Sequence, residues 1–423
     1  YAQPWTYTTL RDVFGVVRFE QDLGEHAMFY ATGGARDGSE QGIYGGITVT
    51  NAATGGANGN ALYVPRTDNN EAVEAGLRVK LGSAVTQEIN FGGSAIWQVN
   101  RNAFDFLYGP GFAGFATNLY NTPTAAIPSS AFVGGNLSNP FPVSRTRLLS
   151  AFASDSIGLW DNRVLLTGGL RLQDIQVKSY NYYNGGALDG TYNKSAATPV
   201  VGLVVKPVQG LSLFANRIEA LQQGPSAPID ATVVNSGAVF APIKSTQYEV
   251  GGKLRVGTFD IGLSLFRIDL PVGYSVDIGG GKKRFGLFGQ QRNEGVEFTI
   301  NGEPVKGVRL IGGASVVDAK LKRTSGGVNE GNRAVGVPEW TANAGLEWDV
   351  AATGLTLTGR VMHTGKQAVN VANTLEIPGW TRFDLGARYV FVAAEKAVVE
   401  SLGQVEVAER REAKKAAQEA AAA

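Results

Sequence analysis

Strict alternation of apolar and polar residues is the feature that most constrains this 423-residue chain. From Tyr248 to Val256, apolar residues or glycine occupy every second position, and Glu249 and Arg255 are among the residues between them. The same period recurs in five further segments: 73–81, 259–265, 340–350, 355–361 and 383–391. A period of two is typical of a β-strand with one apolar and one polar face. The chain is therefore predicted to be all-β.

The connections between the predicted strands alternate between short and long. Asp161-Asn162, Gly257 and residues 207–210 and 351–354 are short turns. The long connections are polar or glycine-rich: 37–69, 101–144, 181–193, 220–244, 323–336 and 367–378. In an up-and-down barrel, this alternation places the short turns at one rim and the long loops at the other. Outer-membrane barrels have this asymmetry.

Strand number and length favour the same architecture. We count about fifteen strands, several of 12–16 residues, whereas strands of soluble sheets have about 5–6 residues. Tryptophans fall near strand ends, as aromatic girdles at two membrane interfaces require: Trp97, Trp160, Trp340, Trp348 and Trp380. The prediction is a transmembrane antiparallel up-and-down β-barrel. A soluble β-rich carbohydrate-binding or adhesive module is the competing interpretation, and it predicts partition into the aqueous phase without detergent.

Composition excludes several other classes of protein. The chain has no cysteine, which excludes disulfides, thiolate metal sites and a catalytic cysteine. Its two histidines, His26 and His363, have no visible co-ligands, so we interpret both as wall or interface residues. A net charge of +1 gives no general affinity for nucleic acid. No apolar run approaches the 18 residues of a transmembrane helix.

Two segments depart from the strand pattern. Residues 279–283, Gly-Gly-Gly-Lys-Lys, are interpreted as a flexible loop, because no helix follows to present N–H groups to a phosphate. From about residue 393 to 423, Ala, Glu, Lys and Arg replace the strand pattern, which predicts a solvent-exposed helical tail. The predicted organisation is a barrel over 1–392 and a tail over 393–423.

Consecutive hairpins resemble the barrel of TonB-dependent siderophore receptors. The resemblance rests on GLWDNRVLLTGGLR (158–171), SAATPVVGLVVKPVQGLSLFANRIEALQQG (195–224), KSTQYEVGGKLRVGTFDIGLSLFRI (244–268), GQQRNEGVEFTINGEPVKGVRLIGGASVVDAKLKRT (289–324), GVPEWTANAGLEWDV (336–350), LTLTGRVMHTGKQ (355–367) and IPGWTRFDLGARYVF (377–391). It covers 1–392 and is strongest after residue 145. The resemblance implies a 22-stranded barrel of the Gram-negative outer membrane, with a plug in its lumen, that imports ferric siderophores with energy from the TonB complex.

The chain departs from that pattern in extent. It opens on barrel-like sequence at Arg11, without a plug or TonB-box segment ahead of residue 1, and the helical tail replaces the last two strands of the family. We therefore expect the barrel portion of a receptor, incomplete relative to the family barrel. We also expect this portion alone to be incompetent for transport. A passive outer-membrane pore or structural barrel is the alternative function.

Loop aromatics are the candidate ligand-binding residues, since Tyr and Phe offer contact area to large, partly apolar siderophores. The candidates are Phe104, Phe106, Tyr108, Phe112 and Tyr120 in 101–144, followed by Tyr180, Tyr182 and Tyr183. Packing of these rings within the loops or in an outer girdle is the competing interpretation. The resemblance implies that iron arrives already chelated, so no cofactor and no metal ligand of the protein are expected. No nucleophile–base pair or carboxylate pair indicates an enzyme.

Overall fold

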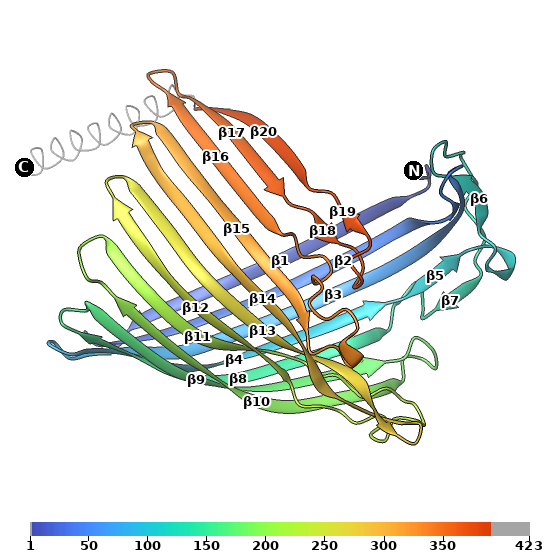
Figure 1. Cartoon of the computed structure of the whole chain (residues 1–423), viewed down its shortest axis with the longest axis horizontal. Coiled ribbons are helices and arrows are strands. Elements are labelled where there is room, and N and C mark those ends of the chain that lie inside the picture. Colours follow the sequence, from blue (N-terminus) through green and yellow to red (C-terminus); the bar gives the residue numbers. More distant parts are fainter. Residues whose placement is uncertain (1, 391–423) are drawn as a thin grey trace, which may run out of the picture.

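A computed structural model describes residues 2–390 as one strongly curved antiparallel sheet (Figure 1). The wall consists of fifteen long strands. They are β1 (Tyr7–Asp22), β2 (Ala27–Asn51), β3 (Gly56–Leu81), β4 (Thr86–Asn102), β8 (Pro142–Leu159), β9 (Val164–Tyr180), β10 (Leu188–Val205), β11 (Leu211–Gln222), β12 (Ile243–Val256), β13 (Phe259–Gly279), β14 (Lys282–Val305), β15 (Val308–Lys322), β16 (Trp340–Val350), β17 (Leu355–Thr364) and β20 (Trp380–Tyr389). The predicted all-β, antiparallel fold is confirmed.

Short elements occupy the loops between wall strands. They are β5 (Phe104–Leu107), η1 (Pro110–Phe112), β6 (Phe115–Asn118), β7 (Phe132–Gly134), η2 (Ser325–Gly327), β18 (Gln367–Ala368) and β19 (Glu376–Ile377). β5 and β6 extend the sheet by pairing with the loop end of β3, and β7 pairs with β5. No helix among residues 2–390 is long and apolar enough to cross a membrane. The predicted helical tail at 393–423 lies outside the described residues.

The predicted short turns line one rim of the wall, and most connections along the other rim are long loops (Figure 1). On the loop side, however, β2–β3 and β13–β14 meet at tight hairpin tips, so the alternation of short and long connections is not strict. Two predicted connections are wrong: 37–69 is not a loop, because β2 and β3 continue as a hairpin whose tip lies at residues 52–55, and 181–193 is shorter than predicted, because β10 begins at Leu188. Both faces of this extension carry polar residues, so apolar alternation ends well before the backbone ladder does. Gly279–Gly281, each with positive φ, form the tip of the β13–β14 hairpin, whereas Lys282 and Lys283 of the predicted loop already belong to β14.

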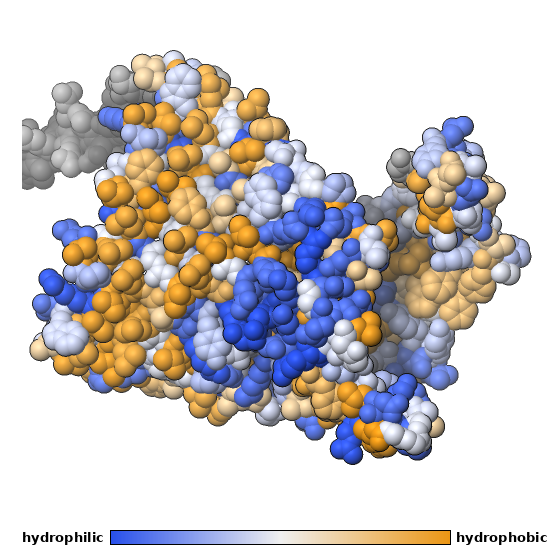
Figure 2. Space-filling model, in the orientation of Figure 1, coloured by the Kyte–Doolittle hydropathy of each residue, from blue (hydrophilic) through white to orange (hydrophobic). Residues whose placement is uncertain are grey.

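The two faces of the wall follow from the register. Residues directly opposite on antiparallel strands point to the same side. One side carries Leu172, Val250, Leu265 and Phe383, all at least half exposed, and we call it the outer face. The other carries Glu74, Arg78 and Glu249, and we call it the inner face. Hydrophobic residues cover much of the strand surface toward the turns, whereas hydrophilic residues gather near the loops (Figure 2).

Close packing of aromatic rings against glycines shapes the inner face. Tyr30 lies opposite Gly76, and Phe214 lies opposite Gly251. A Cβ atom on Gly76 would stand 2.6 Å from the Tyr30 Oη, and one on Gly251 would stand 2.6 Å from the Phe214 ring. These positions therefore require glycine because a ring covers the space of a side chain, and not because of backbone conformation.

The sheet does not close on itself within the described residues. β1 pairs only with β2, and β20 pairs only with β17. Every residue of β1 is exposed, and Leu385 of β20 is 91% exposed. Each of these strands therefore presents one free backbone edge, which bare lipid does not tolerate.

Candidate ligand-binding surface

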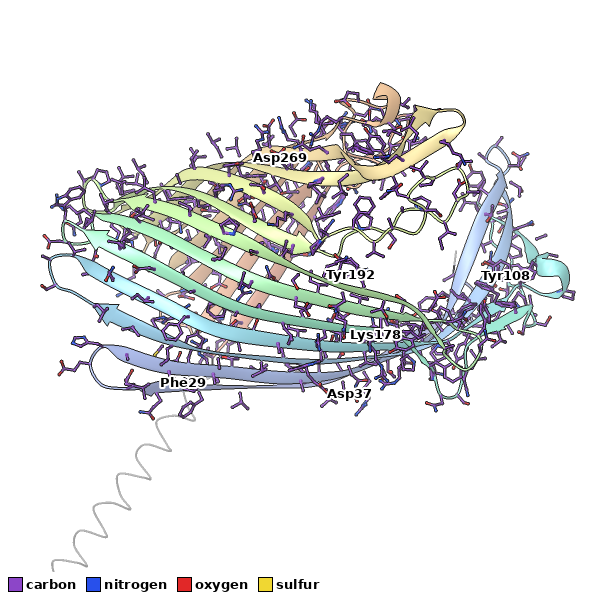
Figure 3. All side chains as sticks on the ribbon, turned by 90° about the horizontal axis from the view of Figure 1, so that it is seen from below. Phe29, Asp37, Tyr108, Lys178, Tyr192 and Asp269 are labelled. Atoms are coloured by element: carbon purple, nitrogen blue, oxygen red, sulfur yellow. The ribbon has the colours of Figure 1, made fainter. Side chains whose placement is uncertain are left out.

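Four predicted aromatics form a continuous chain of rings beyond β3. Phe104 and Phe106 lie 4.8 Å apart, Phe106 and Tyr108 5.5 Å, and Tyr108 and Phe112 5.9 Å, between ring centroids. Alternation along β5 places Phe106 on the face of Leu62, its partner on β3, and this face continues the inner face. Figure 3 places Tyr108 at the loop end of the wall.

Three more rings complete this aromatic cluster from other segments. Phe132 of β7 lies 6.1 Å from both Phe104 and Phe106. Tyr182 lies 5.0 Å from Phe104, and Tyr183 lies 5.9 Å from Phe132. Phe132 is not among the residues predicted from the sequence, because it joins the cluster through the β5–β7 pairing, which only the fold reveals. The aromatic cluster is Phe104, Phe106, Tyr108, Phe112, Phe132, Tyr182 and Tyr183.

Two predicted site residues lie apart from the aromatic cluster. Tyr120 is 67% exposed and its hydroxyl donates to the Ala52 carbonyl oxygen at 2.6 Å, near the β2–β3 tip. The Arg145 guanidinium lies over the Tyr180 ring, with its Cζ atom 5.8 Å from the centroid of that ring. Rings of the cluster pack on one another yet remain partly open, with Tyr183 48% and Phe112 54% exposed. They combine loop packing with an accessible apolar surface.

Polar side chains, most of them neutral, line part of the inner face. A cavity of about 390 Å³ there is bounded by strands β4, β8, β9 and β11. Its polar lining includes Ser94, Ser150, Thr146, Gln173 and Gln222, together with the charged Arg171 and Asp174. Hydroxyl and amide groups both donate and accept hydrogen bonds, so this surface suits a ligand rich in amides, hydroxyls or carbonyls.

A charged network lies on the inner face of β1, β2 and β3. Arg36 contacts Asp12 at 2.6 Å, and Arg66 contacts Asp68 at 2.7 Å and Glu40 at 3.9 Å. These pairs are partly exposed, so each contributes little to stability. They fix the direction of the charged groups around a cavity of about 300 Å³.

The loops are held in place by specific hydrogen bonds. The buried Tyr192 hydroxyl accepts the Gly224 N–H at 3.0 Å and so anchors loop 223–242 to β10. The Asn235 amide exchanges two hydrogen bonds with the backbone of Phe285, at 2.9 and 3.0 Å. The loop rim is thus joined to the tall β13–β14 hairpin.

A second clamp joins the loops that precede β16 and β20. Arg333 forms ion pairs with Glu339 and Glu376, and Lys366 lies 3.4 Å from Glu376. The hydrogen bond from Arg333 holds the pKa of Glu376 below its ordinary value, and the nearby Lys366 acts in the same direction. The carboxylate therefore stays ionised at neutral pH and keeps the two loops together.

The turn end of the inner face has a different, basic character. A cavity of about 1150 Å³ there is lined by Arg163, Lys206, Lys253, Arg255 and Asp260. Arg255 is paired with Asp260 at 2.6 Å, which leaves an excess of positive charge. This surface lies at the opposite end of the wall from the aromatic cluster.

The two histidines lie in different parts of the wall. His363 stacks on Trp340 of the outer face, with ring centroids 4.0 Å apart, and its Nδ1 lies 2.8 Å from the Thr381 hydroxyl. His26 lies in the β1–β2 turn. Within residues 2–390, no three His, Asp or Glu side chains gather in a way that could hold a metal ion.

Together, these features define a class of protein. The outer face is apolar, the inner face is polar, the turns are short, and the long loops carry an aromatic cluster over a hydrogen-bonding wall. This is the wall of an outer-membrane-type β-barrel with a ligand-accessible loop rim.

Comparison with known protein families identifies the family of this chain. The family described as "TonB dependent receptor-like, beta-barrel" matches residues 3–405, and the chain belongs to this family. Family members are outer-membrane proteins of Gram-negative bacteria and act as transport receptors, which assigns the chain to that membrane. The predicted boundary at 392 stays a prediction.

Relatives and solved structures agree with this assignment. The chain is 34% identical over 397 residues to the ferrichrome receptor FcuA of Yersinia enterocolitica, covering 92% of the chain and 50% of that receptor. It is similar to BauA, the ferric preacinetobactin receptor of Acinetobacter baumannii, with a TM-score of 0.77, 31% identity, and coverage of 91% and 56%. The siderophore receptor PiuA of the same species shares the fold, with a TM-score of 0.74, 18% identity, and coverage of 91% and 58%. The chain thus spans about half the length of these proteins.

Proposed function

We propose that this chain forms the ligand-facing barrel wall of an outer-membrane receptor that imports ferric siderophores. The observation that carries the proposal is the aromatic cluster, which stays partly exposed at the loop end of a wall whose inner face also offers hydroxyl and amide groups. Siderophore complexes are large, rich in hydrogen-bonding groups and partly apolar, so both surfaces contribute to binding. Similarity to the ferrichrome and preacinetobactin receptors supports the same ligand class.

The iron in this proposal is cargo. It arrives inside the siderophore, so the protein supplies contact area and hydrogen bonds and needs neither a metal ligand nor a resident cofactor. The chain acts by binding and passage, without a catalytic step. Import is energised through the TonB complex, which distinguishes the receptor from a passive pore.

The free edges of β1 and β20 bear on what the described wall does alone. Both edges need partners before the wall is stable in lipid, so we propose that transport requires a closed barrel and that this wall is not competent by itself. Uptake of ferric siderophore into liposomes by this chain alone would contradict that part of the proposal.

The test uses the protein made from its complete gene in an iron-starved Gram-negative host. Ferrichrome and preacinetobactin loaded with radioactive iron are offered, and binding and uptake are measured with and without a proton-motive-force uncoupler. We expect uptake that the uncoupler abolishes, while binding remains. Uptake that persists with the uncoupler would instead indicate a passive pore.

The matched variants are Phe104→Ala and Phe106→Ala, with Tyr120→Ala as the control outside the aromatic cluster. Loss of a stacked ring costs about 0.5–1.5 kcal/mol beyond its contact area, so each cluster variant should weaken siderophore binding about ten-fold. Equal affinities for the cluster variants and the control would refute a role for the cluster in binding.

A further inference from the structure

The loop-side half of the inner face is almost free of charge from β8 to β16. The register fixes which side chains point inward, for example Ser150 beside Gln173 of the next strand. The inward residues concerned lie in 144–150, 173–179, 192–198, 218–222, 243–247, 266–272, 289–293, 315–321 and 341–345. Among these described positions, Lys194 of β10 is the one side chain that is charged at neutral pH. We call this surface the low-charge wall.

The other charges in the loop-side half of the inner face cancel. The charged network of β1, β2 and β3 contains two arginines and three carboxylates, which leaves an excess of one negative charge. Arg382 and Asp384 of β20 form an ion pair at 3.1 Å. Lys194 offsets the excess carboxylate of the network. The strands of the described wall therefore present no net charge at this end of the inner face.

Two carboxylates without a cation follow on the same face, further from the loops. Glu249 of β12 accepts hydrogen bonds from Asn216 at 3.1 Å and from Gln247 at 3.4 Å. Glu297 of β14 lies directly opposite Ser315 and is exposed. Neither carboxylate has an ion pair among residues 2–390. Both lie between the low-charge wall and the basic cavity at the turn end, so they repel an anion that approaches from the loop side.

A surface of this kind discriminates between ligands by their charge. Hydroxyl and amide side chains form hydrogen bonds with the carbonyl and amide groups of a ligand, but they give an anion no counter-charge for the hydration that it loses. A ferric ion held by three hydroxamates forms a neutral chelate, because each hydroxamate carries one negative charge. Catecholates in place of the hydroxamates, or additional free carboxylates, leave the chelate with several negative charges.

We propose that the low-charge wall selects an electrically neutral ferric chelate of the tris-hydroxamate type and rejects chelates that carry several negative charges. The inference rests on the proposed function and specifies the class of siderophore that the same surface accepts. Gln173 and Gln222, which line the cavity of about 390 Å³, supply hydrogen bonds to the chelate, and the aromatic cluster supplies apolar contact.

The test uses the protein made from its complete gene and purified in detergent, with ferrichrome and ferrichrome A loaded with radioactive iron as probes. Both chelates hold iron through three hydroxamates, but ferrichrome A also carries three free carboxylates. We expect ferrichrome to bind more tightly than ferrichrome A by about ten-fold or more. Salt screens interactions between charges, so the affinity for ferrichrome should not change between low and high salt.

Gln173→Lys/Gln222→Lys adds two cations to the low-charge wall. This double variant should reduce the preference for ferrichrome over ferrichrome A by about ten-fold or more and make binding of ferrichrome A sensitive to salt. The matched control, Gln209→Lys/Ser212→Lys, adds the same charge at the turn end of the inner face and should keep the preference of the parent. Heat-dependent gel mobility confirms that each variant is folded. Gln222→Lys alone, at an exposed position, repeats the test with one added charge.

The outcomes separate this inference from the proposed function. Equal affinities of the parent for the two ferrichromes, or an unchanged preference in the folded lysine variants, would overturn the inference. Binding of ferric preacinetobactin without binding of either ferrichrome would also overturn it and would leave the proposed function standing. Failure to bind any of the three chelates would overturn the proposed function together with the inference.

Discussion

The pairing of Phe214 with Gly251 yields a quantitative prediction about barrel stability. A Cβ atom at residue 251 would stand 2.6 Å from the Phe214 ring and 2.6 Å from the Leu263 carbonyl oxygen. Gly251→Ala must therefore move a ring or a strand. Overpacking of this kind costs about 1–3 kcal/mol. Alanine loses less backbone entropy than glycine when the strand folds, which offsets this cost by about 0.5–1 kcal/mol. The expected net loss is about 1–2 kcal/mol, a shift of roughly 5–30-fold in the unfolding equilibrium.

Gly252→Ala is the matched control, one residue away on the outer face. Its Cβ would meet only the flexible end of Leu213, at 3.2 Å, and the Ser212 carbonyl oxygen at 3.7 Å. Urea unfolding of the full-length protein in phosphatidylcholine vesicles, followed by Trp fluorescence, measures both variants. Gly252→Ala should match or slightly exceed the parent. Phe214→Leu should recover part of the loss in the Gly251→Ala background, since the ring is one of the two obstacles. Equal stability of the two glycine variants would refute the steric argument.

Two further predictions concern the loops. The hydrogen bond from Arg333 lowers the pKa of Glu376 in the folded protein. The contribution of Glu376 to loop docking should therefore be complete above its ordinary pKa of 4.5 and be lost as the pH falls through the lower folded pKa. Hydrogen exchange of the loop amides measures this pH dependence, and Glu376→Gln should remove it. Tyr192→Phe should leave the buried Gly224 N–H without a hydrogen-bond acceptor, at a cost of about 1–3 kcal/mol, and speed proteolysis of loop 223–242. The control is Tyr183→Phe, at a position that is 48% exposed, which should leave this proteolysis unchanged.

The sequence predicts the wall where one face meets lipid and the other does not. Apolar Val250 lies on the outer face, toward lipid, and charged Glu249 lies on the inner face. The resulting period of two identifies β12 and its neighbours as strands. The sequence no longer predicts strands where both faces of the sheet contact water. Asp37 and Asn69 are directly opposite partners in a continuing ladder, yet their polarity indicated a loop. Apolar alternation therefore marks the limit of the membrane and not the end of a strand.

Proximity along the chain explains which site residues the sequence could find. Phe104 and Phe106 alternate within β5, Tyr108 follows directly after it, and the structure brings the three rings together. Phe132 joins them only because β7 pairs with β5. Tyr120 is near them in sequence but contacts the β2–β3 tip instead. Composition thus identifies a candidate loop, whereas pairing decides which rings share a surface.

Glycine has a role in the wall that turn chemistry does not reveal. Gly251 and Gly295 lie within strands and each faces a ring, Phe214 or Phe266, across a neighbouring strand. A slip of two residues would keep every side chain on its correct face, so the apolar pattern alone does not forbid it. The same slip would place the Phe214 ring against Glu249 or Lys253 instead of glycine. Ring–glycine pairs therefore fix the register that alternation leaves open, which is why a wall with so many glycines has a defined strand pairing.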